Sequence, residues 1–318
     1  MNLPVKLCLA PMAGVTDRAF RELAMEYGAT MCTTEMISIK GLYYNDKKTA
    51  DLLENGEREH PIAIQLFGHE PEIFRETVPK ALSFGGDYID INCGCPAKKI
   101  ISNSDGSALM KTPELIGEIV KAVTDSCNVP VGVKMRLGWD ENSINAVQCA
   151  KVAENSGASY ITVHGRTTKQ NYSGQCNYGE IAKVVKSVNI PVIANGDIKS
   201  PCDAQRVIEQ TGCAGIMVGR ATLGNLHLIK EIADFLEKGL GIPKQSNNEK
   251  LLLAKRHIGL IVKYKGEQNG IKEARKHALW YVKGMPNNVK YKDMLVRCKT
   301  YNEMCEIFNE LNKICEDV

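Results

Sequence analysis

The sequence has no long hydrophobic run: no stretch approaches the roughly 18 consecutive apolar residues that a membrane-spanning helix requires. Residues 1–5 also lack the charged segment and following apolar run of a secretory signal, so we expect none. The composition, 44% hydrophobic and 24% charged, is typical of a globular protein with a sizeable core. We therefore expect a soluble, cytoplasmic protein with no membrane partner.

The twelve cysteines are scattered along the whole chain, and several lie inside apolar runs. In a chain of this size that distribution predicts reduced thiols rather than a disulfide framework. Cys93 and Cys95 form a Cys-x-Cys pair, but Cys8, Cys32 and Cys127 provide no further ligands at short spacing. The sequence therefore predicts no metal site.

Eight short apolar runs recur along residues 1–238, mostly 24 to 32 residues apart, with one longer interval of 43 residues. Most intervals carry helical patterns. One has Thr112 as N-cap, Pro113 at the first helical position and apolar residues at 3.6-residue spacing from Leu115 to Val123. Eight such units predict an α/β fold, a TIM (β/α)8 barrel over residues 1–238, with an open doubly wound sheet as the alternative. The predicted strands are 6–11, 30–36, 62–67, 88–93, 131–137, 160–164, 192–194 and 215–218.

Polar side chains recur on one phase near the ends of these runs. They alternate with apolar neighbours, as side chains on opposite faces of a strand do. In a barrel the inward phase at the carboxyl ends forms the active-site floor. Lys134 on this inward side is costly to bury unless its charge is paired, and it would be favoured beside a cofactor that becomes anionic. His164 could instead be a floor residue that only forms hydrogen bonds. The residues are Glu35, Gln65, Asp90, Asn92, Lys134, His164, Arg166 and Asn195.

Cys95 lies directly after the fourth run, where Pro96 ends the strand. A core cysteine is the commoner fate of this residue type. The position at a strand end, the polar neighbours Asp90 and Asn92, and the adjacent Gly94 favour a catalytic thiol instead.

Three glycine-containing turns follow other strands. Asn195-Gly196-Asp197 and Gly219-Arg220 close the seventh and eighth strands, where barrels often bind a phosphate. Each turn alone could be an ordinary strand-to-helix connection, but two adjacent turns favour a phosphate-bearing ligand. The turn at residues 11–14, after the first strand, could lie against a flat ring or be a turn only.

Residues 239–249 are predicted to be a linker, and residues 250–318 a small helical domain with helices near 251–262, 271–282 and 291–311. Residues 244–299 hold fourteen basic and four acidic residues. Solvated helical faces would explain this charge, and phosphate contact would explain it equally. Trp280 and Tyr281 could contact nucleic acid, form the core of this domain or dock it against the barrel.

Together these motifs resemble the tRNA-dihydrouridine synthase family, in order along nearly the whole chain. The barrel motifs are LAPMAGVTD (9–17), QLFG (65–68), DINCGCP (90–96), VKMR (133–136), VHGRT (163–167), NGDI (195–198) and GRA (219–221). In the tail, Arg275-Lys276-His277, Trp280-Tyr281 and Lys283-Gly284 resemble the bacterial B-type subgroup.

The resemblance implies a monomeric FMN-dependent oxidoreductase: a TIM barrel with a helical tRNA-binding domain, reducing uridines in tRNA with NADPH. Reduced FMN would deliver hydride to C6 of the uracil and the Cys95 thiol would supply the proton to C5. Asn92, Arg166, Arg275 and Lys276 are expected to bind the tRNA substrate. FMN contacts are expected from Pro11, Met12, Ala13, Gln65, Lys134, His164, Asn195, Gly196, Asp197, Gly219 and Arg220.

Two alternatives remain at this stage. One is an FMN barrel acting on a free pyrimidine, such as a dihydroorotate dehydrogenase, which would leave the basic tail without a role. The other is an RNA-binding module whose barrel is only a scaffold. The NADPH-versus-NADH preference and the modified tRNA position are not encoded in any motif that we recognise.

Overall fold

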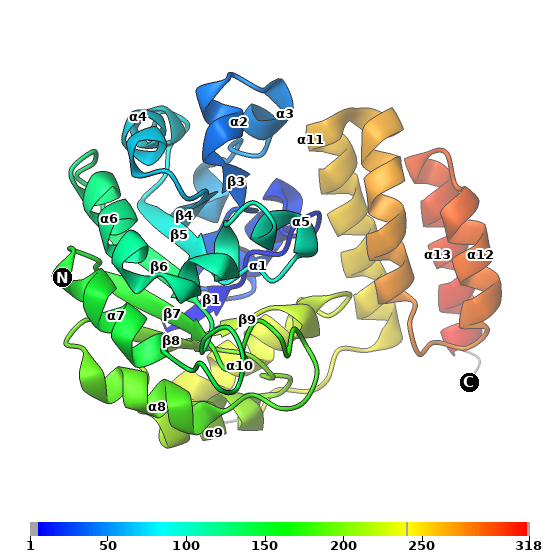
Figure 1. Ribbon diagram of the computed structural model, residues 1–318. Helices are drawn as coiled ribbons and strands as arrows, with labels where there is room; N and C mark the ends of the chain where they lie inside the picture. Colours follow the sequence, from blue (N-terminus) through cyan, green and yellow to red (C-terminus); the bar gives the residue numbers. More distant parts are fainter. Residues whose placement is uncertain (1–5, 240, 317–318) are drawn as a thin grey trace.

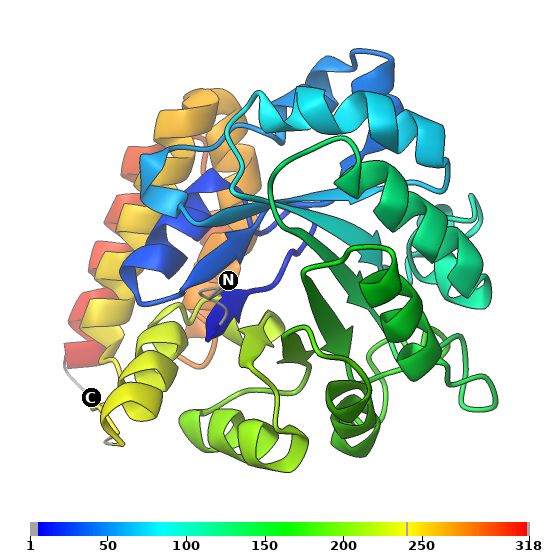
Figure 2. The same ribbon diagram turned by 90° about the vertical axis from the view of Figure 1, so that its left-hand side faces the viewer.

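The computed structural model describes residues 6–239 and 241–316, and most of the chain forms a closed barrel of parallel strands surrounded by helices (Figure 1, Figure 2). The ring closes where β1 pairs with β9 and β2 pairs with β4. This closure confirms the predicted barrel and rules out the open sheet. In the described residues the barrel strands are β1 Leu7–Leu9, β2 Met31–Thr33, β4 Ile62–Phe67, β5 Tyr88–Cys93, β6 Val131–Met135, β7 Tyr160–His164, β8 Val192–Asn195 and β9 Gly215–Val218.

The predicted second strand is shorter than expected. β2 ends at Thr33, and a separate strand β3 (Ile37–Ser38) pairs with the end of β4 outside the ring. The side chain of Thr34 explains the break, because its Oγ1 accepts the Gln65 N–H at 2.9 Å and donates to the Glu35 carbonyl at 2.9 Å. A side chain thus replaces the main-chain ladder at this point.

Helices cover the outside of the barrel (Figure 2). Helix α6 shows why they pack there: Ile116, Ile119, Val120 and Val123 lie on one stripe and are buried. Thr112 occupies the predicted N-cap position, but its side chain makes no capping hydrogen bond. The principal helices of this layer are α1 Arg18–Glu26, α4 Pro71–Leu82, α6 Pro113–Thr124, α7 Ala146–Asn155, α8 Tyr178–Ser187, α9 Pro201–Thr211 and α10 His227–Lys238.

Shorter helices lie in the loops between these elements. They are α2 Ile39–Tyr43, α3 Lys47–Asp51, α5 Lys98–Ile101 and the 3-10 helices η1 Glu57–Glu59, η2 Gly106–Lys111 and η3 Arg220–Thr222. Both α5 and η2 follow β5, so they lie near the predicted thiol. Among the described helices, none combines the length and apolar character that crossing a membrane requires.

The barrel interior changes from apolar to polar toward the carboxyl ends of the strands. Tyr160 fills the apolar part, and it fits because a Cβ at Gly132 would lie only 2.0 Å from its ring. Gln65, His164 and Asn195 lie two or four residues after the apolar interior residues of β4, β7 and β8. They point to the same side of their strands, into the barrel. The polar layer is therefore confined to the end of the barrel where TIM-barrel enzymes hold their sites.

A helical region follows the barrel and packs beside it: α11 Asn247–Tyr281, α12 Asn288–Arg297 and α13 Tyr301–Glu316 (Figure 1). The segment labelled α11 consists of two helices joined at Gly266, whose backbone is not helical (φ +72°), in agreement with the predicted break between residues 262 and 271. Its first helix begins before the predicted residue 251, because Ser246 and Glu249 form a capping box. The single helix predicted over 291–311 is wrong. Thr300 accepts the Glu303 N–H at 3.2 Å and Glu303 accepts the Lys299 N–H at 2.7 Å, so a new helix begins there.

Helix α11 docks on α1 through polar and aromatic contacts. Lys265 Nζ lies 2.9 Å from Asp17, Tyr264 donates to Glu22 at 2.7 Å, and Arg256 pairs with Glu26. Of the two tail aromatics, Tyr281 is buried, and the main chain of Trp280 is so close to Gly224 that a Cβ there would lie 2.4 Å away. The main chain at Trp280 and Tyr281 therefore packs against the barrel at Gly224, while the Tyr281 hydroxyl bonds His257 of the same helical domain at 3.2 Å.

Candidate active site

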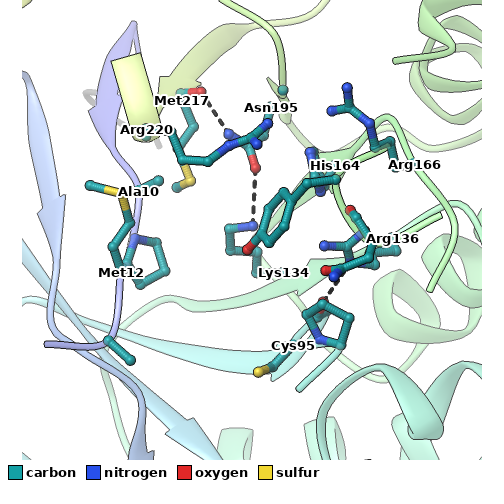
Figure 3. A pocket seen from close by; sticks show the side chains of 18 of the residues that line it. Ala10, Met12, Cys95, Lys134, Arg136, His164, Arg166, Asn195, Met217 and Arg220 are labelled. Carbon is teal, nitrogen blue, oxygen red and sulfur yellow. Dashed lines mark hydrogen bonds between the residues drawn. The ribbon is translucent and has the colours of Figure 1, made fainter. Parts of the chain in front are cut away.

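A cavity of about 1000 Å³ opens at the carboxyl ends of the barrel strands (Figure 3). Every strand-end loop that carries a sequence-predicted site residue contributes to it. Of the predicted residues, Arg275, Lys276 and the two floor carboxylates Glu35 and Asp90 are not among the lining residues. The others line the cavity: Pro11, Met12, Ala13, Gln65, Asn92, Cys95, Lys134, His164, Arg166, Asn195, Gly196, Asp197, Gly219 and Arg220.

The two thiols of the Cys-x-Cys pair have different environments. Cys93, the last residue of β5, is 0% exposed, and burial raises its pKa well above the ordinary value. Cys95 is half-buried and lines the cavity. Its main chain is held by Asn92, whose Oδ1 accepts the N–H groups of Gly94 (3.1 Å) and Cys95 (2.9 Å). Cys95 is therefore the accessible thiol of the pair.

A chain of side-chain hydrogen bonds stands behind Asn92. Asn92 Nδ2 donates to Gln65 Oε1 at 2.7 Å, and Gln65 Nε2 donates to Asp90 at 2.6 Å. A carboxylate can only accept, so Asp90 orients the Gln65 amide, which in turn orients Asn92 with its oxygen toward the Cys95 loop. The side chain of Asn92, which is predicted to bind substrate, thus has its amide oxygen engaged by the main chain.

Burial raises the pKa of Asp90 to about 6, against the opposing effects of the Gln65 hydrogen bond and the positive charge of Lys134. Above that pH the carboxylate is charged. Lys134, on the neighbouring strand β6, is its nearest compensating cation within the barrel floor.

Lys134 and Asn195 point toward each other across the floor (Figure 3), with Lys134 Nζ donating to Asn195 Oδ1 at 3.1 Å. Asn195 Nδ2 donates in turn to the Met217 carbonyl at 2.8 Å, which fixes the amide. Burial lowers the pKa of Lys134 to about 8, although Asp90 raises it. Burial and the charges of Lys134 and Arg136 lower the pKa of His164 to about 2. At neutral pH the floor therefore holds a cationic lysine and a neutral histidine.

The turn after β8 is tightly packed. Gly196 has φ +118°, and a Cβ there would lie 2.3 Å from Cys176 Sγ and 2.7 Å from the His164 ring. Asp197, in the left-handed region at φ +53°, accepts from Arg166 at 2.6 Å and from the Cys176 N–H at 3.1 Å. Burial alone would raise the pKa of Asp197, but these hydrogen bonds lower it. Arg166 and Asp197, predicted as separate contacts, thus form an ion pair.

Tyr172 and Arg136 line the cavity, although neither was proposed as a site residue from the sequence. Tyr172, in the loop after β7, is 50% exposed, and the guanidinium of Arg220 lies 4.3 Å from its ring centre. Arg136 is buried and donates to the carbonyls of Gly94 (2.8 Å), Thr167 (2.9 Å) and Asn171 (2.8 Å). Arg136 therefore ties the thiol loop to the loop that carries Tyr172. Arg136 belongs to the VKMR motif, which could have identified it. Tyr172 lies in a loop, where strand and helix periodicity give no information.

The two tail residues predicted to bind RNA differ in position. The Arg275 guanidinium donates twice to the Cys298 carbonyl, at 2.6 and 3.1 Å, and so joins α11 to the end of α12. Lys276 reaches the barrel rim, where its Nζ lies 3.4 Å from the position of a Cβ on Gly14. Lys276 is thus near the cavity mouth, whereas Arg275 is engaged within the helical domain.

The dihydrouridine synthase family model matches residues 8–316. The tRNA-dihydrouridine synthase B of Pseudomonas aeruginosa is 39% identical over 305 residues, covering 96% of this chain and 92% of that protein. A probable tRNA-dihydrouridine synthase of Rickettsia prowazekii is 39% identical over 317 residues, 99% and 95% of the two chains.

Among solved structures, morphinone reductase superposes with a TM-score of 0.54 at 14% identity, over 77% of this chain and 89% of that one, a likeness of fold alone. The family match and the relatives agree with the motifs on the strand ends, and they confirm the resemblance, including its B-type character. The chain belongs to the dihydrouridine synthase family.

Proposed function

We propose that this protein reduces the C5=C6 bond of specific uridines in tRNA, in the cytoplasm, with FMN as cofactor and NADPH as reductant. The observation that carries the proposal is the half-buried thiol of Cys95 in the same cavity as the half-buried cation of Lys134. The family and its named relatives supply the reaction class.

The cavity residues fit a flavin mononucleotide. The turn after β1 is held by the Met12 N–H, which donates to Thr16 Oγ1 at 2.9 Å. This turn forms one wall of the cavity. A Cβ on Gly219 would lie 3.3 Å from Ala10 and 3.7 Å from Met12 Sδ, so a larger residue would crowd that wall. Lys134 offers a cation, and Arg220, with 49% of its side chain exposed, offers a fork for phosphate oxygens.

When bound, reduced FMN supplies the hydride that adds to C6 of the uracil. The side chains of this chain prepare the charge and the proton. Lys134 is mostly protonated at neutral pH and would stabilise an anionic ring placed beside it. His164 is neutral there, so it contributes hydrogen bonding without adding a second positive charge.

Cys95 supplies the proton that C5 requires after hydride addition. In its thiol form Cys95 carries a proton that it can donate, so it can act as a general acid. Its main chain is held by Asn92, and Asn92 is oriented through Gln65 and Asp90. This support restricts where the thiol can move, which favours proton transfer to one fixed point.

Transfer RNA reaches the cavity along the helical domain. Residues 244–299 carry a surplus of ten positive charges, and Lys276 lies at the rim beside Gly14. The target base must leave its stack to enter the cavity mouth. Phosphate contacts to the basic domain would hold the RNA while that base is extruded.

Mass spectrometry of tRNA from cells that lack the gene tests this function. The expected result is loss of a uridine that is two hydrogens heavier, at one or a few defined positions. Its restoration by the wild-type gene, but not by a Cys95→Ala gene, would link the modification to the thiol. Unchanged dihydrouridine at every position, in a strain with no second enzyme of this family, would refute the proposal.

A further inference from the structure

Two hydrogen bonds from one residue hold the carbonyl group of Cys95. The N–H of Ser107 donates to that oxygen at 3.0 Å, and Ser107 Oγ donates to it at 2.9 Å. Ser107 lies in η2, twelve residues along the chain, and is 0% exposed. A buried hydroxyl needs such an acceptor, because a buried donor without a partner loses the hydrogen bond that it makes to water in the unfolded chain. The contact is therefore a fixed part of the thiol loop.

Gly106 brings η2 against the same peptide group. Its φ is +59°, and a Cβ there would lie 2.9 Å from the Cys95 oxygen and 3.2 Å from the Cys95 Cβ. Asp105, the residue before, is anchored in turn by His69 Nδ1 at 2.8 Å, from the loop after β4. The main chain of η2 thus packs directly on the thiol-bearing residue and is itself tied to the barrel.

These contacts complete the restraint on Cys95. Asn92 binds its N–H at 2.9 Å, and Ser107 binds its carbonyl. With both groups held, φ and ψ of Cys95 are fixed, and only rotation about the Cα–Cβ bond moves the sulfur. We propose that Ser107 is a positioning residue for the Cys95 thiol, directing it into the cavity toward the uracil. This inference rests on the role proposed above for Cys95.

Replacing Ser107 with alanine tests the proposal, since Ser107→Ala removes the Oγ donor and leaves the N–H. Ser102→Ala is the matched control, because Ser102 is exposed and its Oγ binds only the Lys99 carbonyl, at 3.2 Å. The first measurement is the rate at which iodoacetamide alkylates Cys95 in the holoenzyme, resolved by peptide mass spectrometry with exposed Cys202 as reference. We expect a change of about threefold or more in Ser107→Ala alone.

The second measurement is single-turnover reduction of uridine in tRNA. Ser107→Ala should slow this step about 10- to 100-fold, with FMN content and tRNA affinity unchanged, because misplacing a reacting group by about 1 Å costs up to 10²-fold. A general loss of folding would instead lower all three quantities together. Wild-type alkylation and wild-type turnover in Ser107→Ala would overturn the proposal.

Gly106→Ala would displace the Cys95 carbonyl from Ser107 while retaining the Ser107 hydroxyl. It therefore serves as the test of the proposal if Ser107→Ala does not fold. It should alter both measurements in the same way, and wild-type values in Gly106→Ala would then overturn the proposal. The alkylation assay does not depend on turnover. If the wild-type protein failed to reduce uridine, the proposed function would fail while the alkylation rates still judged whether Ser107 positions the thiol.

Discussion

The glycine after β8 allows a quantitative test of how tightly the cavity floor is packed. In Gly196→Ala the new Cβ would lie 2.3 Å from Cys176 Sγ and 2.7 Å from His164 Cδ2. The backbone there has φ +118°, which side chains of L-residues rarely adopt. The substitution therefore combines a conformational cost with a steric one.

The two costs can be estimated separately. A non-glycine residue in a sparsely populated backbone region costs about 1–3 kcal/mol. Inserting a methyl group into a packed site costs about 1–3 kcal/mol more. Gly196→Ala should therefore lower the free energy of unfolding by about 2–6 kcal/mol. Gly212→Ala is the matched control, because Gly212 has φ +66° but no atom within 4 Å of its Cβ position, so it should cost only about 1–2 kcal/mol.

Urea unfolding of the apoproteins measures the free energies, and flavin absorbance of the purified proteins measures FMN content. We expect Gly196→Ala to lose FMN, because relief of the clash moves the His164 ring or the Gly196 peptide, both in the cavity lining. Adding Cys176→Ala should recover part of the stability, since it removes the nearer of the two clashing atoms. Gly212→Ala should keep its flavin.

Equal urea midpoints and equal FMN content in Gly196→Ala and Gly212→Ala would show that the Cβ at residue 196 meets no obstruction. A Cys176→Ala change that gave no recovery in the Gly196→Ala background would show that the sulfur is not the obstructing atom. Either result would mean that the turn after β8 tolerates a side chain and does not form a close-fitting wall.

Three further predictions follow from the site and the tail. Cys95→Ala should keep its bound flavin but lose roughly 10²–10⁴ in turnover, whereas exposed Cys202→Ala should retain activity; normal single-turnover reduction by Cys95→Ala would exclude a general acid at this position. If residues 244–299 contact six phosphates, tRNA affinity should fall about 10³-fold between 50 and 200 mM salt, and a flat profile would place the charge off the RNA path. Because the pKa of His164 falls from 6.5 to about 2 on folding, the unfolded chain takes up a proton below pH 6.5 that the native state does not, so stability decreases with acidification. His164→Gln apoprotein should lose less stability than wild type between pH 6.5 and about 4, and parallel profiles would contradict the buried neutral histidine.

The barrel was predictable because parallel strands that are buried on both faces have short, nearly continuous apolar sequences. Four of the eight strands have the bounds that the runs predict, at 62–67, 88–93, 160–164 and 215–218. The predicted strand over 30–36 was too long because a strand pattern does not reveal that the side chain of Thr34 replaces a main-chain partner. Likewise, apolar spacing continued through residues 298–300, where the Thr300–Glu303 cap starts a new helix.

The sequence predicts which residues line the site better than it predicts the hydrogen bonds between them. Strand parity places Gln65, Asn92 and Lys134 in one cavity, because residues on the inward phase of a closed barrel must converge. Parity does not show that Asn92 turns its oxygen to the Cys95 loop. The contact of Ser107 with Cys95 depends on how η2 folds back, and nothing in the local pattern marks it.

Local charge was the least reliable basis for predicting which tail residues are available to contact RNA. Arg275 and Lys276 are neighbours in a basic stretch, yet one binds the Cys298 carbonyl and the other reaches the barrel rim. Helical geometry explains the difference, since adjacent residues on a helix point about 100° apart and face different partners. A basic run therefore predicts the sign of a surface but not which of its residues are free to meet RNA.

Helix α1 connects the helical domain to the cavity of the barrel. The turn that lines the cavity at residues 11–16 leads directly into α1, whose N-cap Asp17 accepts the Phe20 N–H at 3.1 Å and also pairs with Lys265 of α11. Glu22 and Glu26 on the same helix bind Tyr264 and Arg256. One short helix thus fixes both the cavity wall and the helical domain. If the helical domain holds RNA as proposed, this dock sets the distance between the RNA and the thiol, and the choice of uridine then depends on the dock as much as on the cavity.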